Sequence, residues 1–172
     1  MKEVHIFIVD DDKMQCELLK DYLLKGNKYK ISIFHTGEEC LLHLDEKPEI
    51  IFLDYNLSSE DKNAKNGMQI LKAIKKRLSS AEVVMFTAQD KIEIAIDTLT
   101  SGAFDYILKN ESAFHRADNV IKNICKRQKL EKSNKFYKNM LIGMGILLGL
   151  IILGTMVLYK MGIVADNLGS GI

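Results

Sequence analysis

The chain has 172 residues, which is enough for one domain of ordinary size with an appendage but not comfortably for two domains. Lys and Arg number 24 against 23 Asp and Glu, so the overall charge gives no reason to expect nucleic-acid binding without a local basic patch. The three cysteines are far apart and form no short metal-binding pair, so we expect reduced packing residues rather than a disulfide framework or a metal site.

The N-terminal residues do not have the pattern of a secretory signal. Charged Lys2 and Glu3 are followed only by the short apolar run Val4–Val9, which three aspartates end. We therefore expect the folded part of the chain to stay in the cytoplasm.

Short apolar runs then alternate with segments of helical periodicity. The runs have the length and β-branched content of strands and cover residues 4–9, 31–34, 50–53, 83–86 and 106–108. Apolar side chains recur at helical spacing after each run, over residues 14–23, 40–44, 68–74, 92–99 and 117–125. The second helix must end near Pro48, because proline cannot continue a helix. The sequence thus predicts alternating strands and helices throughout this part of the chain.

Such alternation predicts an α/β fold, because right-handed crossovers place a helix over a parallel sheet after every strand. We expect a doubly wound five-stranded parallel sheet of the flavodoxin-like kind, with strand order 2-1-3-4-5. In this order the first and third strands are neighbours at the switch point, where such sheets bind ligands.

Acidic residues follow both of these strands. Asp10 and Asp11 come directly after the first strand, and Asp54 comes directly after the third. Crowded carboxylates repel, so one would hold a proton unless a cation compensated them. Mg²⁺ suits such a site, because it prefers a few carboxylate oxygens, several waters and a phosphate oxygen. The alternative for the acidic pair is a capping cluster, since Asp12 can cap the first helix.

Two further strands end in groups suited to phosphate. Thr87 follows the fourth strand and offers a hydroxyl donor, and Lys109 follows the fifth and offers a compact positive charge. Taken singly, Thr87 can be a turn residue and Lys109 a solvated charge. Four strand ends that agree on one chemistry favour a phosphoryl site.

These residues resemble the receiver domain of two-component response regulators, over roughly residues 2–126. The acidic pair, the acceptor aspartate, the hydroxyl, an aromatic residue and the lysine occur in the family's order, each in its expected element: Asp10, Asp11, Asp54, Thr87, Tyr106 and Lys109.

The resemblance implies a phosphoacceptor site. Asp54 would attack the phosphoryl group of a phosphohistidine on a sensor histidine kinase or a phosphotransfer protein. Mg²⁺ would be held by Asp10, Asp11, Asp54 and the main-chain carbonyl of Asn56.

The resemblance also implies a switch. Lys109 would pair with the phosphoryl oxygens, and Thr87 would move to hydrogen-bond the new phosphate. Tyr106 would then swing inward behind Thr87 and alter the adjacent surface, although an aromatic residue here can also be simple edge packing.

The sequence departs from the family in two places. Asn110 follows Lys109 where the family usually has proline, often after a cis bond, and a cis bond before a non-proline residue costs about 3 kcal/mol. The polar segment 57–66 is longer than usual and lacks the common proline, which indicates either a gating or kinase-binding loop or a tolerated surface insertion.

A membrane-spanning helix is predicted near the C-terminus. Residues 140–159 carry no charge, include ten Leu or Ile, and have the length that crosses a bilayer core. A buried core helix or an oligomer interface is the alternative. We expect a receiver domain over 1–127, a basic juxtamembrane linker over 128–138, a transmembrane helix over 139–160 and a short extracytoplasmic tail over 161–172.

The flanking charges predict an orientation. Lys160 and Asp166 are the charges after the apolar segment. Six basic residues precede it: Lys126, Arg127, Lys129, Lys132, Lys135 and Lys138. The positive-inside rule then places the receiver domain in the cytoplasm, on a single-pass anchor in the bacterial inner membrane. We expect the basic residues to contact anionic lipid rather than nucleic acid.

Two properties of the C-terminal segment remain expectations. Because no proline or glycine occurs over residues 113–142, we expect the linker to be a helical stalk. Gly145 and Gly149 form a pair typical of helix dimerisation, which permits a weak homodimer, but glycine is also common in spanning helices.

The functional hypothesis is a membrane-tethered phosphoacceptor that signals by binding partners and is not otherwise an enzyme. The alternative is a phosphorylation-independent adaptor that keeps the receiver fold. A phosphatase with an aspartate nucleophile would need a second acid two residues later, where this chain has Asn56.

Overall fold

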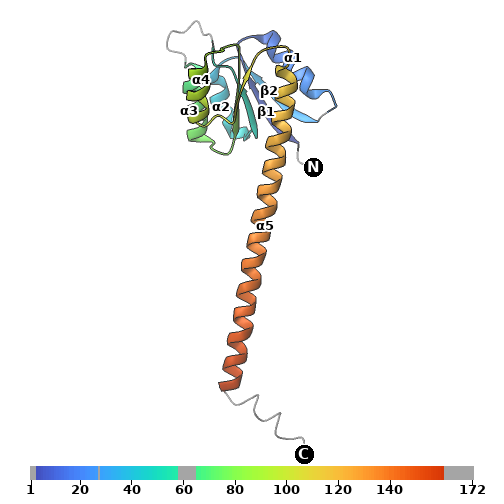
Figure 1. Ribbon diagram of the computed structural model, residues 1–172, viewed down its shortest axis with the longest axis vertical. Coiled ribbons are helices and arrows are strands. Elements are labelled where there is room, and N and C mark those ends of the chain that lie inside the picture. Colours follow the sequence, from blue (N-terminus) through green and yellow to red (C-terminus); the bar gives the residue numbers. More distant parts are fainter. Residues whose placement is uncertain (1–2, 27, 58–64, 161–172) are drawn as a thin grey trace, which may run out of the picture. The chain divides into compact units, whose positions relative to one another are not determined.

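The computed structural model describes residues 3–26, 28–57 and 65–160, which form two compact units. Unit 1 is Met1–Ile124 and unit 2 is Cys125–Ile172 (Figure 1). The predicted tail over 161–172 and most of the predicted long loop over 57–66 lie outside the described residues.

Unit 1 contains a five-stranded parallel sheet. Its strands are β1 (Val4–Val9), β2 (Tyr29–Phe34), β3 (Ile50–Leu53), β4 (Glu82–Thr87) and β5 (Asp105–Leu108). Their order is β2-β1-β3-β4-β5, and every neighbouring pair is parallel. This confirms the predicted flavodoxin-like sheet and its strand order.

Helices cover both faces of the sheet. They are α1 (Lys13–Leu24), α2 (Gly37–Leu42), the 3₁₀ turn η1 (Leu44–Glu46), α3 (Gly67–Arg77), α4 (Ile92–Thr100) and the first part of α5 (Ala113–Lys160). The second predicted helix is thus split into α2 and η1, and η1 ends before Pro48 as expected.

Side-chain alternation along the strands divides the core into two layers. On one face, Phe7, Ile51 and Met85 pack with Ile70 and Leu71 of α3. On the other face, the ring of Phe86 contacts the rings of both Phe52 and Phe114. Through Phe114, α5 packs against the sheet. The central strands are buried on both faces, which is why they are continuously apolar.

Two helices present apolar side chains to solvent, contrary to what their periodicity alone suggests. On α1, Met14 and Leu18 are 72% and 48% exposed, whereas Cys16 and Leu19 face the core. On α4, Ile92 and Leu99 are likewise exposed. The helices were predicted correctly, but their inward faces are set by the sheet beneath them.

Unit 2 is described by the helical residues 125–160 of α5. The predicted linker over 128–138 is therefore helical throughout, in keeping with its lack of proline and glycine. An 18-residue window of α5 has a mean hydropathy of 2.6 and none of it is buried, which makes α5 the one membrane-span candidate in the described part of the chain. No atom lies within 4 Å of where a Cβ would be at Gly145 or Gly149, so neither glycine packs against another described segment. Dimerisation through this pair stays a prediction.

Candidate functional site

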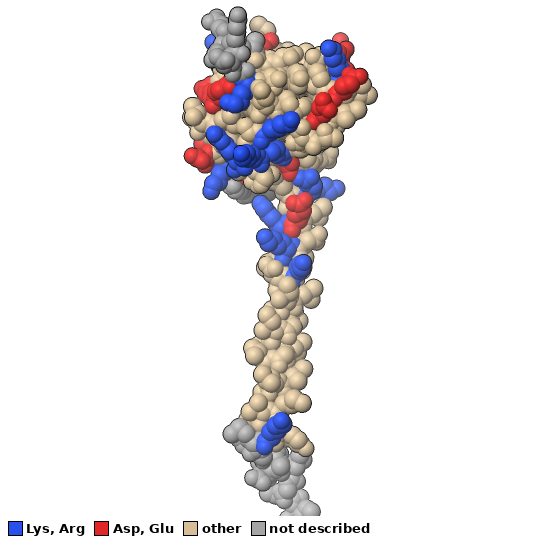
Figure 2. Space-filling model, turned by 90° about the vertical axis from the view of Figure 1, so that its left-hand side faces the viewer, with Lys and Arg blue, Asp and Glu red and all other residues tan. Residues whose placement is uncertain are grey.

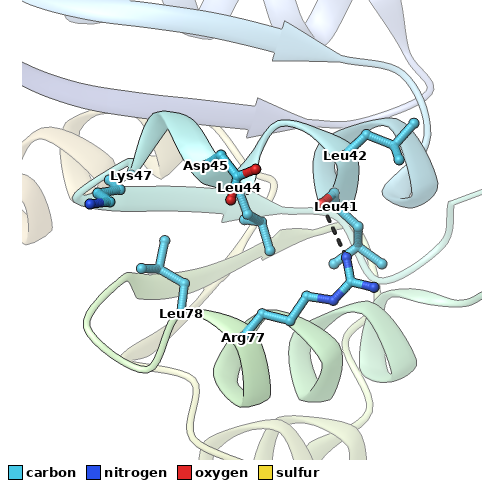
Figure 3. A pocket seen from close by; sticks show the side chains of 7 residues that line it. All are labelled: Leu41, Leu42, Leu44, Asp45, Lys47, Arg77 and Leu78. Carbon is cyan, nitrogen blue, oxygen red and sulfur yellow. Dashed lines mark hydrogen bonds between the residues drawn. The ribbon is translucent and has the colours of Figure 1, made fainter.

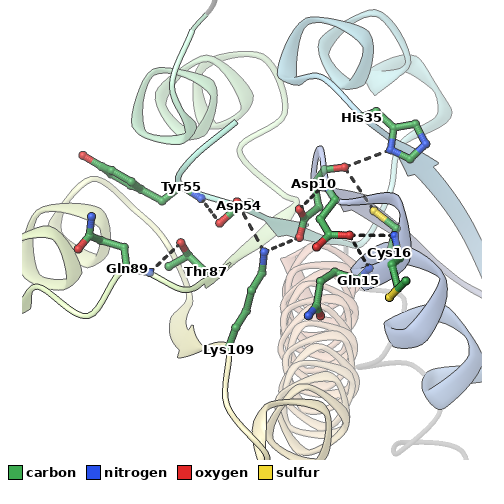
Figure 4. Close-up of polar contacts among 11 residues, drawn as sticks. Asp10, Gln15, Cys16, His35, Asp54, Tyr55, Thr87, Gln89 and Lys109 are labelled. Carbon is green, nitrogen blue, oxygen red and sulfur yellow. Dashed lines mark hydrogen bonds and ion pairs between the residues drawn. The ribbon is translucent and has the colours of Figure 1, made fainter. Parts of the chain in front are cut away.

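The strand ends of unit 1 bring the predicted acidic residues together. Asp10 follows β1 and Asp54 follows β3, and both side chains are almost completely buried. One carboxylate oxygen from each of Asp10, Asp11 and Asp54 lies within 4.8 Å of the others. Parallel strands end at the same edge of a sheet, so residues far apart in sequence share one crevice here (Figure 4).

Lys109 lies among these carboxylates. Its Nζ is 2.7 Å from Oδ2 of Asp10 and 3.6 Å from Oδ2 of Asp54 (Figure 4). Burial by itself lowers the pKa of Lys109, but its contacts with the two carboxylates outweigh burial and raise that pKa. The ammonium is therefore held charged, and the crevice contains three carboxylates against one compact cation.

Asp10 is fixed through its main chain as well as its side chain. Its N–H donates to the carbonyl of Phe34 at 3.1 Å, and its carbonyl accepts the thiol of Cys16 at 3.4 Å. Nδ1 of His35 lies 3.1 Å from the same carbonyl and donates when it carries the proton. Sequence reasoning missed both Cys16 and His35, because no pattern near Asp10 indicates which distant side chain meets its backbone.

The carboxylate of Asp10 also accepts the N–H of Asp12 at 3.0 Å. Asp12 itself caps α1, since its carboxylate accepts the N–H groups of Met14 and Gln15. The capping alternative is therefore right for Asp12, while Asp10 and Asp11 turn toward Asp54.

Asp54 is held at the point where β3 leaves the sheet. Its N–H donates to the carbonyl of Val9 at 2.9 Å, and its Oδ1 accepts the N–H of Tyr55 at 2.8 Å. Gly67, the first residue of α3, lies so close that an added Cβ would collide with the backbone of Asp54 and Tyr55. Glycine is thus required where α3 begins beside the acceptor.

Thr87 and Tyr106 are connected through the loop after β4. Thr87 is fully buried, and its Oγ1 accepts the N–H of Gln89 at 3.3 Å. The hydroxyl of Tyr106 donates to the carbonyl of Gln89. Burial, and next the charge of Asp54, raise the pKa of Tyr106, so this hydroxyl remains a donor. The two predicted switch residues, Thr87 and Tyr106, therefore both form hydrogen bonds with the main chain of Gln89, in the loop between β4 and α4.

The segment after Lys109 does not follow the family's usual form. No peptide bond in the described residues is cis, so the Lys109–Asn110 bond is trans. Oδ1 of Asn110 accepts both the N–H and the hydroxyl of Ser112, which organises the turn into α5. Asn56, predicted to supply a main-chain ligand, is exposed two residues after Asp54, and its role stays a prediction.

The burial of Asp10 gives a testable pH dependence. Burial raises the pKa of Asp10 above its ordinary 3.8, and Lys109 opposes this only in part. The folded state therefore binds more protons than the unfolded state, so this group makes folding less favourable as pH rises above 3.8.

We expect Asp10→Asn to raise the melting temperature in EDTA at pH 7, because it removes a charge that burial disfavours. The gain should shrink as pH falls toward 4, and we expect added Mg²⁺ to stabilise the parent but not the variant. Thermal unfolding measured at several pH values, with exposed Asp97→Asn as control, checks this. A variant less stable than the parent at pH 7 in EDTA would contradict it.

Comparison with known proteins agrees with this geometry. Residues 6–120 match the family model described as the response regulator receiver domain. The chain is 32% identical over 109 residues to the transcriptional regulatory protein ZraR of Klebsiella oxytoca. The aligned region covers 63% of this chain and 23% of that protein. The chain is 30% identical over 152 residues to the putative response regulator NtrX-like of Rickettsia felis. That aligned region covers 87% of this chain and 30% of the relative. The chain thus spans between a fifth and a third of the length of these relatives.

Solved structures show the same fold. The signal receiver domain of a putative LuxO repressor protein from Vibrio parahaemolyticus superposes with a TM-score of 0.67 and 26% identity, over 76% of this chain and 96% of that chain. A CheY-like receiver domain protein from Methanospirillum hungatei has a TM-score of 0.65 and 22% identity, over 74% and 98% of the two chains.

Proposed function

This chain belongs to the response regulator receiver family, and on that premise we propose that it is a membrane-tethered phosphoacceptor whose Asp54 takes a phosphoryl group from a sensor histidine kinase or a phosphotransfer protein. The chain signals by binding partners and carries no other catalytic output. The observation that carries the proposal is the convergence of Asp10, Asp11, Asp54 and Lys109 in one crevice.

The residues of the crevice divide the chemistry of phosphoryl transfer. An oxygen of Asp54 attacks phosphorus, the new O–P bond forms an acyl phosphate, and the N–P bond to the donor histidine breaks. The released imidazole nitrogen keeps the electron pair and takes a proton from solvent. Lys109, already 3.6 Å from Asp54, offsets the charge of the transferring oxygens, and Thr87 supplies a hydroxyl donor.

The donor set fits a divalent metal. Three carboxylates lie within mutual reach and Lys109 supplies one positive charge, which leaves an excess of negative charge for a hard cation. Asp10, Asp11 and Asp54, with the main-chain carbonyl of Asn56, would hold Mg²⁺. When bound, Mg²⁺ neutralises charge that develops on the phosphoryl oxygens.

The signal would pass through the Thr87, Gln89 and Tyr106 contacts. A hydroxyl of Thr87 that turns to the phosphate must give up the N–H of Gln89. Tyr106 holds the carbonyl of the same residue, so it would be released together with the loop. The surface of α4, β5 and the start of α5 changes as a result.

Labelling with a small phosphodonor tests the proposal. We expect the purified full chain in detergent to take up an acid-stable, base-labile phosphate from acetyl phosphate with Mg²⁺, and to lose this labelling in EDTA. A chain that takes up no label under any metal condition would instead support the phosphorylation-independent adaptor.

We further propose that residues 139–160 span the bacterial inner membrane, with unit 1 in the cytoplasm. The helix carries Tyr137 near one end of its charge-free stretch and Tyr159 at the other, about 33 Å apart along the axis at 1.5 Å per residue. That length suits a hydrocarbon core of about 30 Å with aromatic side chains at both interfaces. Figure 2 shows the charge-free stretch, with basic side chains before and after it.

An arginine at the centre of this segment should prevent insertion. We expect Leu150→Arg to lose most carbonate-resistant membrane association, because arginine at a helix centre costs about 2.5–3.5 kcal/mol of insertion free energy. Leu130→Arg, which lies before the apolar segment, is the matched control and should insert normally. The two variants are compared by fractionation of membranes after expression. Equal retention of both would contradict a spanning helix.

A further inference from the structure

The main-chain carbonyl of Asp10 meets two side-chain donors within the described part of unit 1. The thiol of Cys16, on α1, donates to it at 3.4 Å, and Nδ1 of His35, directly after β2, lies 3.1 Å from it (Figure 4). A carbonyl oxygen has two lone pairs and can only accept, so His35 meets it with the proton on Nδ1. Two elements that flank the end of β1 thus engage both acceptor positions of one oxygen.

Both donors are held in place by their own surroundings. Cys16 is buried, and burial raises the pKa of its thiol to about 12, so the thiol keeps its proton. The N–H of His35 donates to the carboxylate of Glu39 at 3.4 Å, and the N–H of Glu39 donates to Oγ1 of Thr36 at 3.1 Å. These bonds tie His35 to the first turn of α2. Both donors are therefore ordered before any ligand enters the crevice.

The carbonyl of Asp10 controls the placement of the next residue, Asp11. Because the peptide unit is planar, the direction of this carbonyl fixes where the N and Cα of Asp11 lie. Asp11 supplies one of the three clustered carboxylates but is less buried than Asp10 and Asp54. Its place in the cluster depends on the turn that leads from β1 into α1. The two donors fix the orientation of that turn.

We propose that His35 and Cys16 are positioning residues for the metal ligand Asp11. By holding the carbonyl of Asp10, they keep the carboxylate of Asp11 beside that of Asp54 before a cation arrives. A ligand that is already in place loses less conformational freedom on binding, so the cation binds more tightly. Groups that orient metal ligands typically change metal affinity by about 10–100-fold. The inference rests on the Mg²⁺ site proposed above.

Metal titration of the full chain in detergent tests the role of His35. Mn²⁺ favours the same oxygen ligands as Mg²⁺, and its free ion gives an electron paramagnetic resonance signal. Loss of this signal gives the dissociation constant of Mn²⁺, and competition gives that of Mg²⁺. We expect His35→Phe to raise both dissociation constants about tenfold.

Two further variants at histidine positions control this result. His35→Asn should restore affinity close to that of the parent, because the amide nitrogen of asparagine can take the place of Nδ1. His43→Phe should leave metal binding unchanged, because His43 is exposed and contacts Glu46 rather than the crevice.

The thiol is tested in the same way. Cys16→Ala removes the donor and should weaken metal binding by a similar factor, whereas Cys16→Ser keeps a hydroxyl donor and should restore it. Urea unfolding without metal accompanies each variant. A bond that only stabilises the fold would lower the free energy of unfolding and leave the metal dissociation constants unchanged, which would contradict a positioning role.

A double-mutant cycle shows whether His35 acts through Asp11. In an Asp11→Asn background, His35→Phe should change the dissociation constants by less than about twofold, because the carboxylate that His35 positions is already lost. An effect of undiminished size in this background would show that His35 acts on another group, and would overturn the inference.

The outcomes separate this inference from the Mg²⁺ site itself. A parent chain that binds both ions, while His35→Phe and Cys16→Ala bind them equally well, refutes the positioning role alone. A parent chain that binds neither ion refutes the metal site and the positioning role together.

Discussion

Replacing Asp54 with Asn is expected to abolish the base-labile phosphate completely. The amide keeps the shape of the side chain and can still accept the N–H of Tyr55, so the end of β3 should keep its conformation. It has no anionic oxygen to attack phosphorus, and it removes one of three carboxylates from the proposed metal site. The variant should therefore fold, bind Mg²⁺ more weakly and take up no label.

The measurement compares Asp54→Asn with the parent chain under identical Mg²⁺ and acetyl phosphate concentrations. Asp12→Asn is the matched control, because asparagine caps a helix as well as aspartate does and Asp12 lies outside the carboxylate cluster. The control should keep labelling within about twofold of the parent, as expected for a surface substitution of this kind. Label that appears equally on Asp54→Asn and on the parent would remove Asp54 from the mechanism.

Replacing Lys109 with Met is expected to have the second largest effect. Methionine keeps much of the length of the side chain but removes the charge that contacts Asp10 and Asp54. Loss of one donor that stabilises a transition-state charge typically slows a reaction by about 10²–10³-fold. We expect the initial rate of labelling to fall by about that factor.

The same substitution should also lower the free energy of unfolding without metal. Removing one partner of a buried ion pair costs about 3–5 kcal/mol, because the remaining charge is left uncompensated. The cost should be smaller at low pH, since burial already raises the pKa of Asp10 and allows it to take up a proton. Mg²⁺ should stabilise the variant more than the parent, because it replaces the missing positive charge.

Urea unfolding with and without Mg²⁺, together with initial labelling rates, checks both effects. The control is Lys91→Met, which removes a lysine from an exposed position outside the crevice. An unchanged labelling rate would show that Lys109 takes no part in transfer. An unchanged unfolding free energy would show that its ion pairs contribute nothing net to folding.

The site could be predicted from the sequence to an unusual extent, because of how parallel sheets are built. Asp10, Asp54, Thr87 and Lys109 each follow a strand, and parallel strands end at one edge. Once the strands were identified by their apolar runs, the meeting of these residues followed without any knowledge of packing. The roles of Thr87, Tyr106 and Asn56 remain proposals.

Contacts between distant segments could not be predicted in this way. His35 and Cys16 both meet the carbonyl of Asp10, yet neither residue type nor spacing marks them. Tyr106 holds the carbonyl of Gln89 across 17 positions of sequence. A groove between α2, η1 and the last turn of α3 likewise brings together two basic residues from separate elements (Figure 3). Lys47 follows η1, and Arg77 is the last residue of α3.

The sequence by itself determined the strands, the helices and the apolar C-terminal segment, because hydrophobic periodicity is a local property of the chain. The strand order was expected from the common doubly wound arrangement, and the tertiary structure confirmed it. Only the tertiary structure decided that Met14, Leu18 and Ile92 face solvent. It also decided that His35 contacts the main-chain carbonyl of Asp10, and that Lys47 and Arg77 line one groove with four leucines. Those features depend on which surfaces of distant segments come into contact, and a period along one segment carries no information about its neighbours in space.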